Sequence, residues 1–189
     1  KLLDYTLQYN LIPQIVPELK TLTVGGTISG VGLESSSFRY GLVPDMVYEF
    51  DILTGTGDIL TINKDNNKEL FYGFPNTYGT LGYVLSAKLK LTDSKPYVHI
   101  KNISFNNPNE FIEEIKKYDN DNPDNINFLD GMLLNKNELF LMKGKMIEEK
   151  PPFLNKYIRQ IYYKTINKQK EDYMTIKDYI WRYDSNSFY

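Results

Sequence analysis

The sequence predicts an α+β protein made of two successive units. Segments rich in β-forming residues alternate with segments that have helical apolar spacing. A glycine-rich stretch at residues 23 to 41 lies in the first half, and the turn cluster TDSKP at residues 92 to 96 ends that half. Beyond the cluster, glycine becomes scarce and asparagine, lysine and tyrosine dominate. We therefore expect one domain over residues 1–94 and another over 95–189.

The composition bounds the class of protein. With 189 residues, 41% hydrophobic and 14% aromatic, the chain is long and apolar enough to build a globular core. The net charge is only −2, so charge gives no reason to expect a nucleic acid partner. There is no cysteine, which excludes disulfides and thiolate metal sites and fits a reducing, intracellular compartment, although the localisation stays unknown.

Two further absences limit the candidate sites. His99 is the only histidine, so we expect no histidine-rich metal site, and any Ser-His-Asp triad would have to use it. It lies in PYVHIKN, which we interpret as a strand with a structural or exposed histidine. No run of about 18 apolar residues is present, so this sequence contains no predicted transmembrane segment. The chain starts within an apolar pattern and without methionine, which suggests an internal fragment.

The first half begins with a short predicted helix. Leu3, Leu7 and Leu11 share one helical face, Pro13 ends the helix, and an extended piece follows. Residues 45–53 and 58–63 form a predicted hairpin around TGTG, because glycine permits the positive φ of a tight turn. We expect residues 68–82 to be irregular and residues 83–91 to form a strand.

The second half is predicted as strand, helix, hairpin and helix. Asn107 and Pro108 begin a capped helix that contains Glu110 at the third position, a capping-box arrangement. Residues 127–146 form two strands around the turn NKN. Residues 153–166 have helical apolar spacing at Leu154, Ile158, Ile161 and Tyr162. The basic side of this predicted helix carries Lys156, Arg159, Lys164 and Lys168. It is interpreted either as a solvated face or as a surface for anionic lipid, and the second interpretation would make a membrane surface a partner.

The glycine-rich stretch is the main candidate for a binding site. It does not fit a dinucleotide fingerprint, because Ser35 replaces the third glycine and no apolar-periodic helix follows. It does not fit a Walker loop either, because the terminal G-K-[ST] is missing. Interleaved apolar residues exclude a solvated linker. Two interpretations remain: a crowded structural turn, or a folded loop whose glycines open backbone N–H groups to a phosphate or a flat ring, with Ser35, Ser36 and Ser37 as further donors.

The order of the motifs resembles a known family. The stretch LTVGGTISGVGLESSSFRYG followed by LFYGFPNTYGTLGYV is similar to the FAD-binding domain of the vanillyl-alcohol-oxidase (PCMH) type, and within it to the sterol side-chain Δ24 reductases. The stretches FLDGMLLNKNELFLMKGKM and DYIWRYDSNSFY are similar to the substrate domain of the same family. The resemblance implies the later part of a PCMH-type FAD domain followed by the start of an α+β substrate domain.

The resemblance also implies FAD contacts. In the glycine-rich stretch these fall on Thr23, Val24, Gly25, Gly26, Thr27, Ile28, Gly30, Gly32, Glu34, Ser35 and Ser36, and a second backbone contact falls on Gly79, Thr80, Leu81 and Gly82. Four features depart from the pattern: the glycine-histidine pyrophosphate loop that usually precedes this region is absent, Phe38 replaces a histidine, Thr56 replaces the turn aspartate, and Tyr83 replaces a small aliphatic residue. We expect the isolated chain to bind FAD weakly for the first of these reasons.

The expected function is that of an FAD-dependent oxidoreductase. Hydride transfer through the flavin would reduce a carbon–carbon double bond or oxidise an alcohol in a small or sterol-like substrate. Arg182 and Tyr183 lie in an aromatic cluster that lines a substrate pocket or forms a core strand with a surface ion pair between Arg182 and Asp184. No catalytic acid or base is assigned, since the cofactor carries the hydride chemistry. The alternative is a scaffold protein that kept the fold without flavin.

Overall fold

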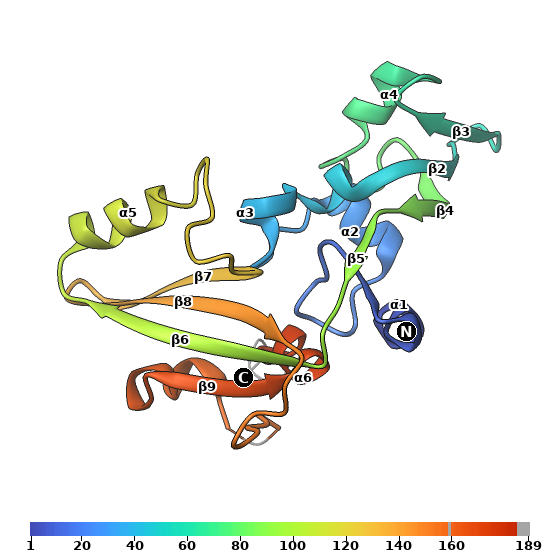
Figure 1. Ribbon diagram of the computed structural model, residues 1–189. Coiled ribbons are helices and arrows are strands. Elements are labelled where there is room, and N and C mark those ends of the chain that lie inside the picture. Colours follow the sequence, from blue (N-terminus) through green and yellow to red (C-terminus); the bar gives the residue numbers. More distant parts are fainter. Residues whose placement is uncertain (159, 185–189) are drawn as a thin grey trace. The chain divides into compact units, whose positions relative to one another are not determined.

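A computed structural model describes residues 1–158 and 160–184. The chain divides into two compact units, Lys1–Asp93 and Ser94–Tyr189, and each sheet lies within one unit (Figure 1). The division falls inside the TDSKP turn cluster. Short helices accompany antiparallel sheets in both units, which agrees with the predicted α+β class.

The first unit is built on a three-stranded sheet of order β3-β2-β4. Its strands are β2 (Val47–Leu53), β3 (Ile59–Asn63) and β4 (Tyr83–Leu89), and a second small sheet pairs β1 (Leu11–Pro13) with β5 (Leu91–Asp93). The β2–β3 hairpin and β4 are therefore as predicted. Gly57 has φ +88° in the hairpin turn, which is the conformation for which glycine is needed there.

The helices of this unit are short. They are α1 (Leu2–Thr6), α2 (Val24–Gly30), α3 (Ser37–Tyr40) and α4 (Lys68–Gly73), with 3₁₀ turns at Leu7–Tyr9 and Val43–Met46. The predicted N-terminal helix thus ends early, because Asn10 adopts a left-handed φ of 56° and Leu11 enters β1. The irregular segment predicted at residues 68–82 begins instead with α4, whose Phe71 lies in the core.

One core stabilises the first unit. Its buried members are Ile15, Ile28, Val43, Met46, Val47, Phe50, Ile52, Ile62, Phe71 and Phe74. In β2, Phe50 and Ile52 are buried and alternate with less buried residues, the period of a strand with one face inward. The Phe50 ring lies 5.0 Å from that of Phe74, so α4 and the segment after it are held against the sheet.

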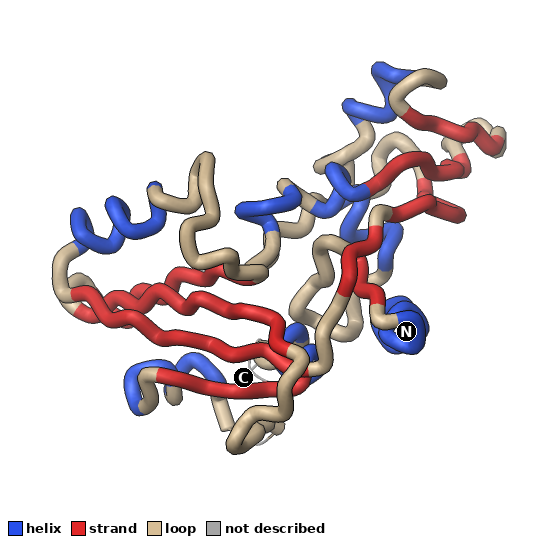
Figure 2. The backbone as a smooth tube through the Cα atoms, viewed as in Figure 1, coloured by secondary structure: helices blue, strands red, loops and turns tan. Residues whose placement is uncertain are grey.

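The second unit contains a four-stranded antiparallel sheet of order β7-β8-β6-β9 (Figure 2). The strands are β6 (Tyr97–Phe105), β7 (Phe128–Asn135), β8 (Glu138–Ile147) and β9 (Glu171–Thr175). Helix α5 (Pro108–Lys116) packs through Phe111 on Leu139 and Leu141, and α6 (Ile176–Ile180) places the Tyr179 hydroxyl beside Gly144. Because strand residues alternate between faces, the two helices lie on opposite faces of the sheet.

Two predictions for this unit need correction. The Asn107 side chain caps α5 by accepting the N–H of Asn109, the second residue of the helix. In the expected capping box it would instead accept the N–H of Glu110, the third residue. The helix predicted over residues 153–166 does not form: the described part of this segment is irregular, with 3₁₀ turns at Tyr162–Lys164 and Ile166–Lys168.

The reason for the second error is tertiary. Asn155 donates its backbone N–H to the Tyr173 carbonyl and its side-chain amide to Asp172, so the segment is bound to β9 instead of to itself. Leu154 and Ile158 are exposed, and only Tyr162 of the predicted inward face is fully buried. The expected basic helix face therefore does not exist, and Arg159 lies outside the described residues.

Candidate functional site

The first candidate segment begins with a capped helix, α2, and not with the folded loop that the sequence predicts. Thr23 caps α2: its Oγ1 accepts the N–H of Gly26 at 3.1 Å, and its carbonyl accepts the N–H of Thr27 at 3.0 Å. Ile28 is fully buried in the core and anchors the helix despite three glycines in seven residues. The first two N–H groups, those of Val24 and Gly25, have no acceptor within a helix.

The serine hydroxyls are used inside the fold. Ser36 is buried and donates its hydroxyl to the Gln14 carbonyl at 2.8 Å. Ser37 Oγ accepts the N–H of Glu34 at 2.9 Å, and Glu34 Oε1 accepts the N–H of Glu18 at 3.2 Å. The Ser36 hydroxyl is therefore already a donor within the fold, whereas the Ser37 oxygen acts as an acceptor and the expectation of a Ser37 donor stays a prediction. Thr27 and Ile28 are likewise buried, so their side chains belong to the fold.

The second candidate segment is a tightly wound loop before β4. Thr77 Oγ1 donates to the Phe74 carbonyl at 2.7 Å, and Thr80 donates both its N–H and its hydroxyl to the Thr77 carbonyl. Gly79 and Gly82 have φ of +86° and +139°. A Cβ at Gly82 would lie 2.5 Å from the Leu53 carbonyl oxygen, so this glycine is required where the loop meets β2.

The structure brings the two segments together. The N–H of Tyr78 donates to the Ser29 carbonyl at the end of α2, with an N···O distance of 3.1 Å. A Cβ at Gly30 would lie 3.6 Å from the Tyr78 ring, and a Cβ at Gly25 would lie 3.2 Å from Val84 in β4. Residues about fifty positions apart in sequence thus form one continuous surface on the first unit.

The glycines on this surface differ in whether packing within the fold leaves room for a side chain in their place. A Cβ would lie 2.9 Å from Thr23 Oγ1 at Gly26 and 2.7 Å from Val43 at Gly32, so packing within the fold explains both glycines. At Gly30, among the described residues, a Cβ would meet only the Tyr78 ring within 4 Å, at an ordinary contact distance. The fold therefore accepts a side chain at Gly30, and its glycine is the one that a bound ligand would explain.

The surface suits a flat, partly apolar group. The two segments expose the apolar or aromatic side chains of Val24, Leu33, Tyr78 and Leu81, with relative exposures from 38% to 74%. Glycine backbone and the hydroxyl-bearing turn at Thr77 and Thr80 supply polar groups beside these side chains. This combination of apolar side chains with a few backbone donors fits an isoalloxazine or adenine ring.

Arg182, predicted as a substrate contact, is buried in the second unit. Its exposure is 4%, its Nη2 forms a salt bridge with Asp130, and its Nη1 donates to the Tyr179 carbonyl at 2.8 Å. The guanidinium carbon lies 4.0 Å from the centroid of the Tyr179 ring and 4.7 Å from that of Tyr183. The core strand considered for this segment is instead α6 and the turn after it. The predicted cluster members Phe188 and Tyr189 lie outside the described residues.

His99 occupies a strand position, as predicted. It lies in β6, where its ring stacks on Tyr173 of β9 with centroids 4.4 Å apart and planes 8° apart. Its Nε2 is 3.5 Å from a Glu171 carboxylate oxygen. No group of three or more metal-ligating side chains gathers in the part of the chain that the structure describes. Among the same residues, no helix has the length and apolar character needed to cross a membrane.

The buried carboxylate of Asp172 was not predicted from the sequence. This side chain is fully buried and accepts hydrogen bonds from the Asn155 amide at 2.7 Å, the Tyr157 hydroxyl at 2.7 Å and the Gln169 amide at 2.9 Å. Burial, and the hydrogen bond to Asp172, raise the pKa of Tyr157 to about 12. The donors line a cavity of about 680 Å³, but their bonds to Asp172 hold the segment in place and leave Tyr157 a poor proton donor.

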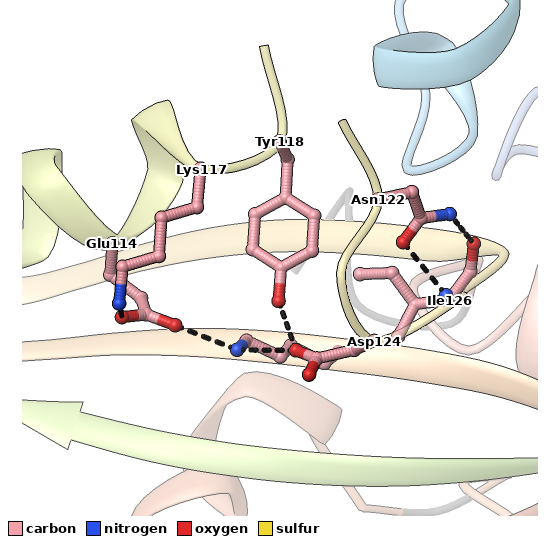
Figure 3. A network of polar contacts seen from close by, with 7 residues as sticks. Glu114, Lys117, Tyr118, Asn122, Asp124 and Ile126 are labelled. Carbon is pink, nitrogen blue, oxygen red and sulfur yellow. Dashed lines mark hydrogen bonds and ion pairs between the residues drawn. The ribbon is translucent and has the colours of Figure 1, made fainter. Parts of the chain in front are cut away.

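A second unpredicted cluster surrounds Lys143 in β8 (Figure 3). Its Nζ lies 2.8 Å from carboxylate oxygens of both Glu114 in α5 and Asp124 in the following loop, and Tyr118 donates its hydroxyl to Asp124. Lys117 and then Lys143 lower the pKa of Glu114, and Lys143 and then Tyr118 lower that of Asp124. The cluster ties the helix and its loop to the sheet.

Comparison with known proteins identifies relatives of the chain. It is 28% identical over 189 residues to Delta(24)-sterol reductase of Homo sapiens, covering 93% of this chain and 36% of the relative. Delta(24)-sterol reductase of Arabidopsis thaliana is 33% identical over 145 residues, covering 74% of this chain and 26% of the relative. Cytokinin dehydrogenase 3 of Arabidopsis thaliana is 34% identical over 91 residues, covering 48% and 17%.

The extent of these matches matters for what they imply. The chain spans little more than a third of the length of the human relative. No protein-family profile matches it. The names of the relatives are those of oxidoreductases, and the sterol reductase matches cover both units of the chain. The chain is therefore related in sequence to the Delta(24)-sterol reductases, as its motifs predicted.

Proposed function

We propose that the protein carrying this chain is an FAD-dependent oxidoreductase. In this proposal the unit Lys1–Asp93 is part of a PCMH-type FAD-binding domain, and the unit Ser94–Tyr189 is the start of the substrate domain. The observation that carries the proposal is the junction of the two cofactor motifs, where Tyr78 bonds to Ser29 and faces an otherwise open Gly30. The resemblance assigns FAD contacts to both of these segments, and their junction supports the proposal.

The residues of the chain would bind and orient the cofactor. Backbone at Gly25, Gly30 and Gly79 would approach it, and Val24 and Leu81 would cover apolar parts of its rings and exclude water. When bound, FAD supplies the site that accepts or donates a hydride. The similarity to proteins named sterol reductases favours a sterol-like substrate for this protein, and the similarity to cytokinin dehydrogenase favours a smaller substrate.

A scaffold without flavin is the alternative, and one observation favours it. The glycines at positions 26 and 32 are explained by packing within the fold, so those two need no cofactor. Gly30 is not explained in this way, and it therefore decides between the two functions.

The test uses the full-length protein that carries this chain. We expect Gly30→Val to lose bound flavin by at least about tenfold in affinity while its melting temperature stays unchanged, because a Cβ at Gly30 meets only an ordinary contact and glycine is a poor helix former. Gly73→Val is the matched control: no neighbour in the described part of the chain lies within 4 Å of its Cβ, and it ends α4 outside residues 23–36 and 79–82, to which the resemblance assigns FAD contacts.

Flavin absorbance after desalting and the melting temperature are the two measurements. Gly82→Ala should lower the melting temperature, since its Cβ would meet the Leu53 carbonyl. A wild-type protein that is folded and colourless, and that takes up no added FAD, would reject the oxidoreductase and favour the scaffold.

A further inference from the structure

Tyr78 combines a strained backbone with an exposed ring. Its φ is +51°, in the left-handed region that side chains other than asparagine and aspartate avoid. The side chain is 74% exposed, so the fold recovers little apolar burial from it. Strained residues of this kind persist where the surrounding structure imposes them, and they concentrate at ligand contacts.

The loop backbone around Tyr78 is held by hydrogen bonds. Its own N–H is bonded to Ser29, Thr77 before it is bonded to Phe74, and Thr80 after it is bonded back to Thr77. These bonds hold the backbone on both sides of Tyr78. The ring lies beside Gly30, 3.6 Å from where a Cβ of that residue would stand.

Other exposed tyrosines of the unit lack this combination. Tyr72, 58% exposed, sits within α4 and packs edge-on against Phe71 at 5.3 Å between centroids. Tyr83, 71% exposed, begins β4 in extended backbone. The Tyr83 ring lies near Gly79, 3.7 Å from where a Cβ of that glycine would stand. Tyr78 differs from it in having a left-handed backbone and in lying beside Gly30 of the first segment.

We infer that the Tyr78 ring stacks on a flat ring of the bound cofactor and so sets how tightly it is held. This inference rests on the proposed function and assigns a side-chain contact to it. An exposed aromatic face beside glycine backbone is complementary to a second aromatic ring. Either the isoalloxazine or the adenine of FAD presents such a ring.

The test compares three variants of the full-length protein: Tyr78→Asn, Tyr78→Phe and the control Tyr72→Asn. Asparagine tolerates the left-handed backbone, so Tyr78→Asn removes the ring without lowering the melting temperature of the flavin-free protein. We expect this variant to bind FAD about 5- to 150-fold more weakly, the range that aromatic stacking on a nucleobase supports. Tyr78→Phe keeps the ring and should bind as the wild type does, and Tyr72→Asn should also bind normally.

Two ligands and the fluorescence of bound flavin separate the rings. If the isoalloxazine stacks on Tyr78, Tyr78→Asn loses affinity for FMN and its bound flavin becomes more fluorescent, since a stacked phenol quenches the excited ring. If the adenine stacks there, the loss is seen with ADP instead. Either result supports the inference.

Three results would overturn it. Tyr78→Asn could bind FAD, FMN and ADP like the wild type while Gly30→Val loses FAD; the proposed function would then stand and the Tyr78 contact would not. A clear fall in the melting temperature of flavin-free Tyr78→Asn would make the ring structural. A wild-type protein that binds none of the three ligands would remove the proposed function and the inference together.

Discussion

At the residue scale, Arg182 shows how a pattern that predicts a binding residue can mark a buried one. A guanidinium among tyrosines is typical of a substrate pocket and equally of a buried ion pair, and the sequence alone does not distinguish them. The structure places Arg182 at 4% exposure with Asp130 as its partner, a residue 52 positions earlier in the chain. That distance in sequence is why the pairing could not be predicted, whereas the neighbouring Asp184 was the obvious candidate.

We expect Arg182→Met to destabilise the second unit by about 3 kcal/mol, because it leaves the Asp130 carboxylate without the cation that offsets its desolvation. Trp181, the sole tryptophan and buried beside Arg182, reports unfolding of this unit in urea. Arg39→Met, at an exposed position in the first unit, should leave that transition unchanged. An Arg182→Met protein that is as stable as the wild type but has a raised KM would return Arg182 to the predicted substrate role.

At the element scale, the sequence predicted strands better than helices. The β-forming residues of β2 and of the β7–β8 hairpin, with the turns between the strands, are local signals, and they were sufficient. Helix α2 was missed because its glycines oppose helix formation, and its stability comes from the Thr23 cap and the burial of Ile28. For the segment 153–166 the error was the opposite, because a helix was predicted that does not form. Its apolar spacing is helical, but its hydrogen bonds to Asp172 and Tyr173 hold the backbone against β9.

The Lys143 cluster joins α5, its loop and β8, and it should make the stability of the second unit depend on pH. The folded pKa values of Glu114 and Asp124 lie below their usual range, so their contribution is present above about pH 4 and is lost as the pH falls through the folded values. Burial alone would lower the pKa of Lys143, but its hydrogen bonds to Asp124 and Glu114 raise it, so the lysine stays charged throughout this range.

We therefore expect the free energy of unfolding of the second unit to fall between pH 5 and 3, as an order-of-magnitude window, and to fall less steeply in Lys143→Met. Trp181 fluorescence in urea at each pH measures it. Lys116→Met is the matched control, because Lys116 pairs only with the exposed Glu113 among the described residues and should leave the slope unchanged. The same pH slope in Lys143→Met as in the wild type would show that other carboxylates dominate.

At the scale of the whole molecule, the boundary and the relationship were accessible from sequence for different reasons. The turn cluster and the change in composition pointed to residues 92 to 96, where the chain divides between Asp93 and Ser94. The motifs pointed to the sterol reductases, and the similarity to those proteins confirms that resemblance. The roles of the two units as FAD and substrate domains remain predictions, since they depend on ligands that bind to the folded surfaces.

The division makes a prediction about folding. Each unit has its own sheet and its own apolar clusters, and β5 closes the first unit by pairing with β1 while Pro96 accepts the N–H of Ile176 within the second. Only Ser94 and Lys95 lie between these two anchors. We expect the separately expressed pieces 1–93 and 94–189 to fold, each with amide NMR spectra that overlay on the matching part of the 189-residue chain.

The physical reason is that a cut at this point separates no two strands that pair in the described sheets, and the two described apolar clusters each lie within one unit. A cut moved to the β2–β3 turn, after Gly57, serves as the contrast, because it separates two strands of one sheet that share buried Phe50, Ile52 and Ile62. Pieces cut there should remain unfolded when separated. Broad, poorly dispersed spectra from 1–93 or 94–189 would show instead that the units need each other to fold, and that their division in the structure is one of shape and not of stability.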